Sequence, residues 1–538
     1  MPVPASERPP RQIQQSDTYF STKPYSSPYL STGLDILDNF YVEYLTSPTA
    51  KVRYNYIGLQ GLRLVLPKTS PSPCRGMVTV SSGRCFGVWG TQLVEITAGG
   101  ATRVVRNSAA PLRTYSGLVR FAENGYQLIL VDGQYGYILD LTSNVFSQIT
   151  DQYFPGVADR DPTRGPSHVV QIDTYFLVNS RNTNNFYWSA PGYIPYAFDL
   201  LQPGVTNLWN GLQYGSKIGD TGNITAMAAT NHLLWLASLN SIEVQFNAAA
   251  VDPNAATGQL FQRVTNSLIG FGCAAPDTFV SFADKVYWLG HDSKGTVGIF
   301  SCGADYQPKR ISDRGVEVRI QSYASYTDAY AFVYAIDGHQ FVQFVFPQGT
   351  SVDGGNVNGA TWCYDITTET WTRRTKWIAA EGQPYRYQGE FAAEAFSQLL
   401  MGDNSSDAVY ALDNTRFDND LPDGSGTQEI QGRFSSPISY NTNKNITYWQ
   451  CQLNHQPGFA PQYGYGSKPR VALQVSNDAG VTFGRSVFRS MGTQGQYAYR
   501  TIWHNLGMGR NRVHLWTVTD PVRRVINGYT LSYEVHSR

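Results

Sequence analysis

The stretch GLVRFAENGYQLILVDG, residues 117–133, consists of an apolar strand, a tight Asn124-Gly125 turn and a second apolar strand, which is the pattern of a β-hairpin. An Asn-Gly or Asp-Gly pair supplies the positive-φ positions that a two-residue β-hairpin requires. The same design recurs in AYAFVYAIDGHQFVQFVF, residues 329–346, around Asp337-Gly338. Seven such units occur, at residues 76–90, 117–133, 168–180, 224–238, 277–292, 329–346 and 391–404.

The spacing of these hairpins indicates the architecture. Their turns are marked by Gly83, Gly125, Asp173, Asn231, Asp284 and Gly338, which are 42, 48, 58, 53 and 54 residues apart. A blade of a β-propeller uses roughly 40 to 50 residues for four antiparallel strands. We therefore predict an all-β chain whose main domain is a β-propeller of six or seven four-stranded blades. The unit at residues 391–404 is short and lacks a clear fourth strand, so both blade counts stay open.

Three regions follow from the extent of the repeat. Residues 1–70 form an extended N-terminal arm, rich in Pro, Ser and Tyr, and the segment that leads into the propeller. Residues 71–427 form the propeller, with long insertions at 191–223 and 347–360 that are typical of partner contacts. Residues 428–538 contain further alternating strands, such as RVALQVSN at 470–477, and are expected to form a β-sandwich-like domain.

Charge divides the chain into two unlike parts, although 41 basic and 41 acidic residues cancel overall. Residues 433–538 contain 12 Lys or Arg and three acids, a net charge of +9, which leaves 29 basic and 38 acidic residues, a net of −9, in residues 1–432. A uniformly basic nucleic-acid binder is excluded, whereas opposite poles suit a multi-subunit assembly.

We expect no membrane span and no cleaved signal, because apolar runs of the necessary length are missing.

The sequence contains no motif of a known catalytic centre. It lacks a G-x-S-x-G elbow, an H-E-x-x-H pair and a phosphate-binding loop, and its six cysteines are far apart with no zinc-ligand spacing. Acidic loops around Asp418 and Asp423 lack the calcium-loop pattern. We therefore expect no enzyme, no metal site and no cofactor.

One local motif predicts a structural turn. SNDAGVTF resembles the Asp-box turn of sialidases and other propellers, in which the Asp side chain bonds the turn backbone, the Gly takes positive φ and the aromatic residue packs beneath. The residues concerned are Ser476, Asp478, Gly480 and Phe483.

The C-terminal part of the chain also resembles a known family. Residues 473–535 are similar to the end of packaged-DNA stabilisation proteins, the tail nozzle or tail hub subunits of short-tailed bacteriophages. The matching positions are Ser490-Met491-Gly492, Gly495, Tyr497, Arg500, Trp503, Leu506-Gly507, Arg510, Val513, Asp520-Pro521-Val522 and Gly528. The segment NFYVEYLTSPTAKVRYNYIGLQGLRL, residues 39–64, is similar to the N-terminal part of that family.

This resemblance implies a structural virion protein of the viral tail. Such a subunit forms a sixfold homo-oligomeric ring below the portal and its adaptor, continues the DNA channel and helps to retain the packaged genome until ejection. Its expected partners are the portal-adaptor proteins, the tail needle, fibre or spike proteins and, transiently, viral double-stranded DNA. It is assembled in the host cytoplasm and resides in the virion tail.

Arginines of the C-terminal domain are the candidates for subunit-interface or channel-facing contacts. They are Arg500, Arg510, Arg512, Arg523 and Arg524. An alternative function from another class is a tail propeller that binds or cleaves host glycans. Cleavage would require two carboxylates about 5 to 10 Å apart beside a sugar site.

Overall fold

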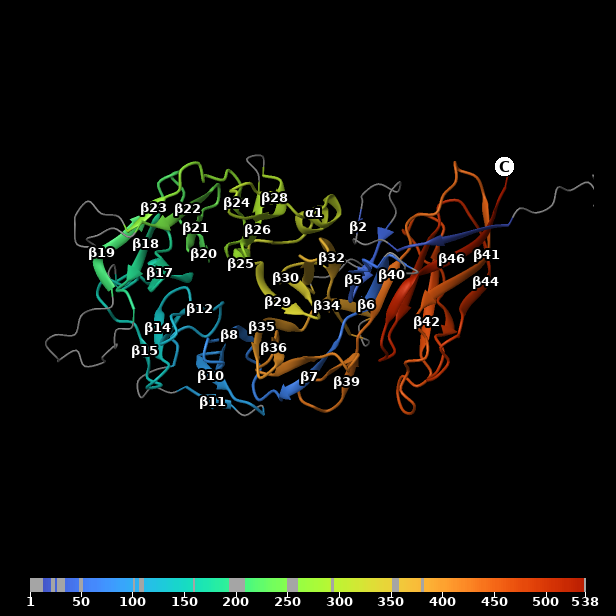
Figure 1. Cartoon of the computed structure of the whole chain (residues 1–538), viewed down its shortest axis with the longest axis horizontal. Coiled ribbons are helices and arrows are strands. Elements are labelled where there is room, and N and C mark those ends of the chain that lie inside the picture. The colour runs from blue at the N-terminus through green and yellow to red at the C-terminus, as the bar shows by residue number, and fades with distance from the viewer. Residues whose placement is uncertain are drawn as a thin grey trace, which may run out of the picture.

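The computed structural model describes residues 13–20, 25–26, 34–47, 52–99, 102–105, 111–157, 160–192, 209–248, 260–291, 295–350, 358–378 and 382–536. Strands dominate these residues, among which α1 (Arg314–Gln321) is the only α-helix. Figure 1 shows a ring of sheets beside a second body built from two layers of long strands. The predicted all-β fold, a propeller with a C-terminal sandwich, is therefore confirmed.

The first three blades follow the chain in order, each with four strands paired in sequence. They consist of β8 (Cys74–Thr79), β9 (Cys85–Trp89), β10 (Gln92–Ile96) and β11 (Thr102–Val104); β12 (Arg120–Glu123), β13 (Gln127–Val131), β14 (Gly136–Asp140) and β15 (Phe146–Gln148); and β16 (Val169–Ile172), β17 (Tyr175–Asn179), β18 (Asn185–Ser189) and β19 (Trp209–Ser216).

The next three blades continue this order. They consist of β20 (Ala226–Thr230), β21 (Leu233–Ala237), β22 (Ile242–Asn247) and β23 (Phe261–Arg263); β25 (Val280–Phe282), β26 (Lys285–His291), β27 (Val297–Cys302) and β28 (Lys309–Arg310), with β24 (Gly272–Cys273) also on β26; and β29 (Tyr330–Ile336), β30 (His339–Phe346), β31 (Ala360–Asp365) and β32 (Thr370–Arg373). Parts of the predicted insertions, residues 193–208 and 351–357, lie outside the described residues.

The seventh blade explains why the last repeat looked incomplete. Its strands are β35 (Gly389–Ala395), β36 (Gln398–Asp403), β37 (Val409–Asp413) and, from the other end of the chain, β7 (Gly61–Leu66). From sequence, residues 61–66 are predicted to belong to the leading segment, whereas their hydrogen bonds assign them to the propeller. This pairing joins the first and last strands of the ring, so the described sheets form seven blades.

A short hairpin holds β7 in place on its outer side. β38 (Asp418–Asp420) pairs with β39 (Thr427–Glu429), and β38 lies along β7. The side chain of Asn419 accepts a hydrogen bond from Leu62 N at 3.0 Å, and Asp420 accepts one from Leu64 N at 2.7 Å. These contacts satisfy backbone donors that an edge strand would otherwise expose.

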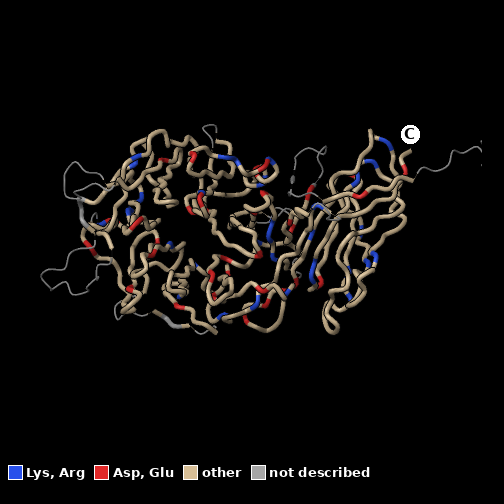
Figure 2. The backbone as a smooth tube through the Cα atoms, in the orientation of Figure 1, with Lys and Arg blue, Asp and Glu red and all other residues tan. Residues whose placement is uncertain are grey.

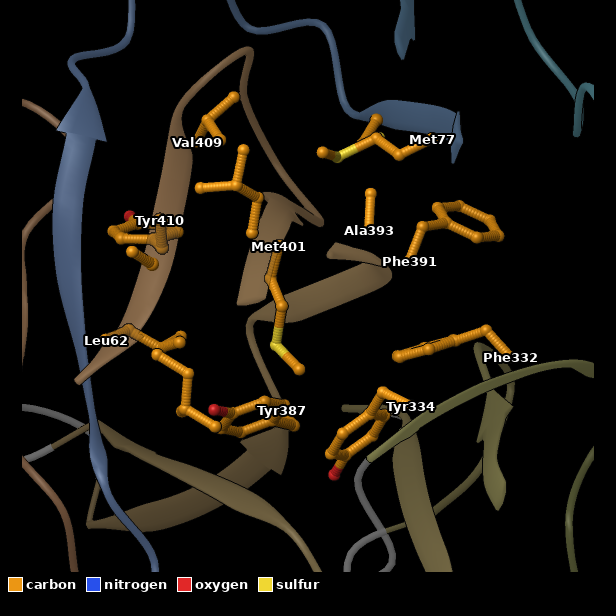
Figure 3. Packing of buried hydrophobic residues seen from close by; sticks show 14 of the residues in the cluster. Leu62, Met77, Phe332, Tyr334, Tyr387, Phe391, Ala393, Met401, Val409 and Tyr410 are labelled. Carbon is orange, nitrogen blue, oxygen red and sulfur yellow. The ribbon is translucent and has the colours of Figure 1, made fainter. Parts of the chain in front are cut away.

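Blades pack face to face because their central strands are apolar on both sides. In β13, Leu128 and Leu130 belong to a cluster shared with the first blade, whereas Ile129 and Val131 belong to one shared with the third. Successive strand residues point to opposite faces, so a continuous apolar run fills two blade interfaces. Figure 3 shows the cluster where the sixth, seventh and first blades meet, with Phe332, Phe391 and Met77 converging.

The sandwich is composed of both ends of the chain. Its first sheet contains β44 (Thr501–Gly509), β41 (Ile446–His455), β46 (Val525–Val535), β6 (Tyr54–Gly58) and β5 (Phe40–Tyr44), with β1 (Gln14–Thr18) also paired to β46. Its second sheet contains β4 (Leu37–Asp38), β40 (Gly432–Ser435), β45 (Val513–Val518), β42 (Arg470–Ser476) and β43 (Val487–Ser490). Two short pairs complete the described strands, β2 (Tyr25–Ser26) with β3 (Leu34–Asp35) and β33 (Thr375–Ile378) with β34 (Gln383–Arg386).

N-terminal side chains fill the core of the sandwich. Phe20, Leu37, Phe40, Val42 and Tyr56 are buried in one cluster with residues of the C-terminal strands. Within the predicted arm, residues 14–18 pair with β46 of the same chain, and Phe20 follows them into the core. Residues 1–12, 21–24 and 27–33 of that arm lie outside the described residues.

Candidate functional site

The seven innermost strands surround a cavity on the propeller axis. Its volume is about 410 Å³, and its lining comes from β8, β12, β16, β20, β25, β29 and β35. A volume of this size suits a small molecule. This volume is too small to hold a segment of duplex DNA.

Four polar side chains, those of Arg120, His168, Gln171 and Ser281, line this cavity among apolar ones. The Arg120 guanidinium reaches Asp277, which lies just before β25 in the fifth blade. It donates hydrogen bonds to the backbone carbonyl of Asp277 at 2.7 Å and to the Asp277 carboxylate at 3.2 Å. Burial, together with the charge of Arg120, lowers the pKa of His168 to about 4, so this imidazole is neutral at pH 7. No Asp or Glu is among the described residues that line the cavity. The carboxylate pair of a glycoside hydrolase is therefore missing from this cavity.

A buried ion cluster joins the propeller to the sandwich. Asp38 in β4 lies between Arg373 at the end of β32 and Arg433 in β40, and its carboxylate receives hydrogen bonds of 2.7 to 3.0 Å from both. Burial opposes ionisation of Asp38, but the two guanidinium groups lower its pKa below the ordinary value. The carboxylate is therefore charged at neutral pH.

The neighbouring residue, Asn39, makes further hydrogen bonds at the same junction between propeller and sandwich. It takes a positive φ of 58°, its amide donates to the carbonyls of Thr375 and Gln431, and its side-chain oxygen accepts from Thr375 N. Because β4 pairs with β32 at Arg373 and Asp38, blade six and the second sandwich sheet form one continuous nine-stranded sheet. The two domains are thus held in a fixed relation. The sequence carries no local signal for this junction, since its partners are more than 300 positions apart.

Two of the five predicted arginines are buried, which contradicts the prediction for them. Arg524 is 1% exposed, donates to the Ile430 carbonyl at 2.8 Å and lies against the Phe40 ring. Arg512 is also 1% exposed, donates to Asn477 and stacks 4.3 Å from the centre of the Tyr448 ring. Burial lowers the pKa of Arg524 to about 10. Both arginines stabilise the sandwich from within, so neither faces a channel or a second subunit.

The other three arginines are exposed but do not share one surface. Arg500 donates to Gln452 and Arg523 stacks over Phe459, both near the end of β41 at His455. Arg510 donates to Asn445 at the opposite end of that strand. Interface or channel contacts by these three residues stay a prediction. Figure 2 shows basic residues spread over the sandwich.

The Asp-box turn has the hydrogen bonds of that motif. Asp478 accepts from Thr482 N at 2.9 Å and from the Ser476 hydroxyl at 2.6 Å, while Gly480 takes a φ of 96°. These hydrogen bonds lower the pKa of Asp478 to about 2. Phe483 is only partly buried, so the expected packing beneath the turn is incomplete. The turn pairs with Asn511 and has a structural role.

The acidic residues around Asp418, which lack the calcium-loop pattern, make structural contacts. Asp418 and Asp420 form ion pairs with Arg416 and belong to the hairpin that holds β7. Within the part of the chain that the structure describes, no three His, Cys, Asp or Glu side chains are grouped to hold a metal ion. The six cysteines are buried free thiols. No helix among the described residues has the length and hydropathy to cross a membrane.

Comparison with known proteins places both domains in one family. A family model described as the β-propeller of bacteriophage P22 Gp10 matches residues 59–417, and one described as the Gp10 β-sandwich matches residues 431–534. No curated protein matches this chain.

The similar solved structures have very low sequence identity to this chain. YCF48 bound to a D1 peptide is 10% identical with a TM-score of 0.38, covering 66% of this chain and 97% of that one. The N-terminal domain of Nup159 is 9% identical with a TM-score of 0.36, covering 70% and 98%. These likenesses carry no functional argument. The family matches span both domains in chain order, and the chain therefore belongs to the bacteriophage P22 Gp10 family of packaged-DNA stabilisation proteins.

Proposed function

We propose that this phage structural protein is a tail nozzle subunit, six copies of which form a ring below the portal and its adaptor. The ring continues the DNA channel and helps to retain the packaged genome until ejection. The observation that carries this proposal is the family match over both the propeller and the sandwich. The family also suggests a structural role without catalysis or a cofactor.

The size of the axial cavity sets the proposed path of the DNA. Because about 410 Å³ on the propeller axis cannot hold a duplex, the channel is the lumen between copies of the chain. Exposed arginines such as Arg510 are candidates for its wall. A wall of few cations suits ejection, since each neutralised phosphate adds salt-dependent affinity that would slow the DNA.

The buried Asp38 cluster suits a subunit that must resist load. A ring around pressurised DNA works only if each copy keeps its shape, and the continuous sheet through β32 and β4 fixes the sandwich to the propeller. The proposed neighbours in the virion tail are the portal-adaptor proteins above and needle, fibre or spike proteins below. Assembly takes place in the host cytoplasm.

Glycan binding or cleavage by the propeller is the weaker alternative. The axial cavity has the size for a sugar, but its described lining holds no carboxylate. A glycan array probed with the purified protein checks this alternative, which specific binding would revive.

Particles assembled without this protein test the proposal. We expect them to package DNA and then lose it, to lack ring density below the adaptor in electron micrographs, and to regain both on addition of the purified chain. Particles that retain their DNA and their tail profile without it would overturn the proposal.

A further inference from the structure

Two loops at one end of the sandwich expose a group of aromatic rings. Residues 456–469 connect β41 to β42, and residues 491–500 connect β43 to β44. Both loops lie at the same end of the first sandwich sheet, because Leu453 near the end of β41 pairs with Thr501 at the start of β44, and His455 at the end of β41 pairs with Ile526 near the start of β46. The exposed fractions are 49% for Phe459, 80% for Tyr463, 58% for Tyr465, 66% for Tyr497 and 40% for Tyr499. We name residues 456–469, 491–500 and 519–523 the aromatic end.

Glycines hold two of these rings in place. A Cβ at Gly458 would lie 2.6 Å from the Tyr497 ring, and a Cβ at Gly492 would lie 2.9 Å from Tyr499. Each tyrosine therefore lies closely against bare backbone, with much of its side chain exposed to solvent. Only glycine permits this approach, and both glycines also take positive φ.

Further contacts tie the loops to each other. Gly495 N donates to the Gly458 carbonyl at 3.2 Å, and the Phe459 and Tyr497 rings meet edge to face with centroids 5.8 Å apart. Arg523 stacks 5.5 Å above the Phe459 ring. Rings fixed in this way lose little conformational entropy on binding, as in the Tyr- and Gly-rich loops of antibody paratopes. A groove of about 710 Å³, partly lined by Tyr497 and Tyr499, adjoins them.

The charge of this surface selects the kind of partner. Its ionisable groups other than tyrosines are the exposed Lys468, Arg500 and Arg523 together with Asp520, whose carboxylate accepts from Arg470 N. Two copies that met through this same surface would bring like charges together, which is unfavourable. The propeller, residues 59–417, contains 24 basic and 29 acidic residues, a net charge of −5. The complementary surface is thus on the other domain.

We propose that the aromatic end docks on the acidic propeller of a second copy of this chain. Such a head-to-tail contact joins unlike surfaces and closes into a ring when the rotation between copies permits. The inference rests on the proposed ring function and names the sandwich surface that makes the contact. It assigns Arg500 and Arg523 to the subunit interface, with Arg510 at the opposite end of β41.

Sedimentation velocity of the purified full chain tests this contact. The wild type is expected to associate with rising concentration, and less so at high salt because the contact is electrostatic in part. The double variant Tyr463→Ser/Tyr497→Ser is expected to associate about tenfold more weakly, since exposed aromatic anchors carry much of an interface's affinity. The matched control is Tyr440→Ser, which removes a ring that is 66% exposed before the other end of β41.

A mixing experiment separates a head-to-tail contact from a symmetric one. A labelled double variant keeps its propeller, so it is expected to bind the aromatic end of one wild-type chain but to prevent extension, and ring closure, at its own aromatic end. Equal association of the double variant and the wild type, loss of binding in the mixture, or a wild type that stays monomeric at every concentration would each overturn the inference. Unfolding midpoints of all variants verify that they fold. The proposed function is judged separately, by the DNA content of particles that lack the protein.

Discussion

The guanidinium of Arg373 donates two hydrogen bonds to the carboxylate of Asp38, from Nε to Oδ1 at 2.8 Å and from Nη2 to Oδ2 at 2.7 Å. This pair lies where the sixth propeller blade continues into the sandwich. A bidentate arginine contact fixes orientation as well as distance. This buried carboxylate, together with Asn39 and the pairing of β4 with β32, therefore fixes the relation between the two domains.

Replacing Asp38 by asparagine is expected to destabilise the protein by about 3–5 kcal/mol, because it removes the negative charge between two guanidinium groups in the interior. Urea unfolding measures the change. Lys309→Gln is the control, since Lys309 and Glu369 form an ion pair on the surface whose loss costs at most about 1 kcal/mol. Equal effects of the two substitutions would show that the Asp38 cluster does not hold the junction.

A second buried pair predicts how stability depends on pH. His339 contacts Asp365 at 2.7 Å and also faces Tyr41, Glu43 and Asp337; the hydrogen bond to Asp365 raises its pKa, outweighing burial. A raised histidine pKa contributes stability that is complete below about pH 6.5 and is lost as the pH rises through the raised value.

Substituting His339 by glutamine should remove this contribution. Melting temperatures measured between about pH 5 and pH 9 are expected to fall towards high pH more steeply in the wild type than in the variant. Asp38 acts in the opposite direction, because its lowered pKa makes its contribution disappear only as the pH falls below about 4. Parallel curves for the two proteins would refute the role of His339.

The closing strand β7 should tolerate no side chain at Gly61. A Cβ there would lie 2.0 Å from the Asp418 carbonyl oxygen, so Gly61→Ala must displace β38 and is expected to cost about 1–3 kcal/mol. Gly270→Ala is the matched control, because no atom lies within 4 Å of its Cβ. If chemical unfolding midpoints of the two variants agree, the hairpin does not restrain β7.

Phe20 is expected to anchor the N-terminal strand to the sandwich. Its ring, 4% exposed, lies 4.7 Å from Phe434 and 5.1 Å from Trp516, and its carbonyl accepts from the Tyr56 hydroxyl. Phe20→Ala should destabilise the protein by about 3–5 kcal/mol. Ile13→Ala, at a position that is 58% exposed, should change it by no more than about 0.5 kcal/mol. Tryptophan fluorescence during denaturation reports both, and similar midpoints for the two variants would contradict the anchor.

The propeller could be predicted because its signals are local. Gly125 and Gly338 take the positive φ expected at their turns. The turn markers Asp173 and Asn231 also take positive φ, whereas at the fifth turn Ala283 does so in place of the marker Asp284. In a single strand such as β13, successive apolar side chains point to opposite faces, so one apolar run specifies the interfaces with both neighbouring blades. Such features need no knowledge of distant residues.

Long-range pairing could not be predicted in the same way. β7 pairs with β37, more than 300 residues away in the sequence, and no pattern within residues 61–66 indicates which strand pairs with it. Arg512 and Arg524 look like surface charges in sequence, yet each stacks on a ring that another segment supplies. The aromatic end was also missed, although its Tyr- and Gly-rich composition at residues 456–469 was a usable signal.

A reconstruction of the phage tail by electron cryomicroscopy would show whether this chain forms the proposed ring around the DNA channel. We predict six copies around the tail axis below the adaptor, duplex density in the lumen between them, and no DNA density along the propeller axes. A single copy, a peripheral position away from the channel, or DNA threaded through a propeller would contradict this account.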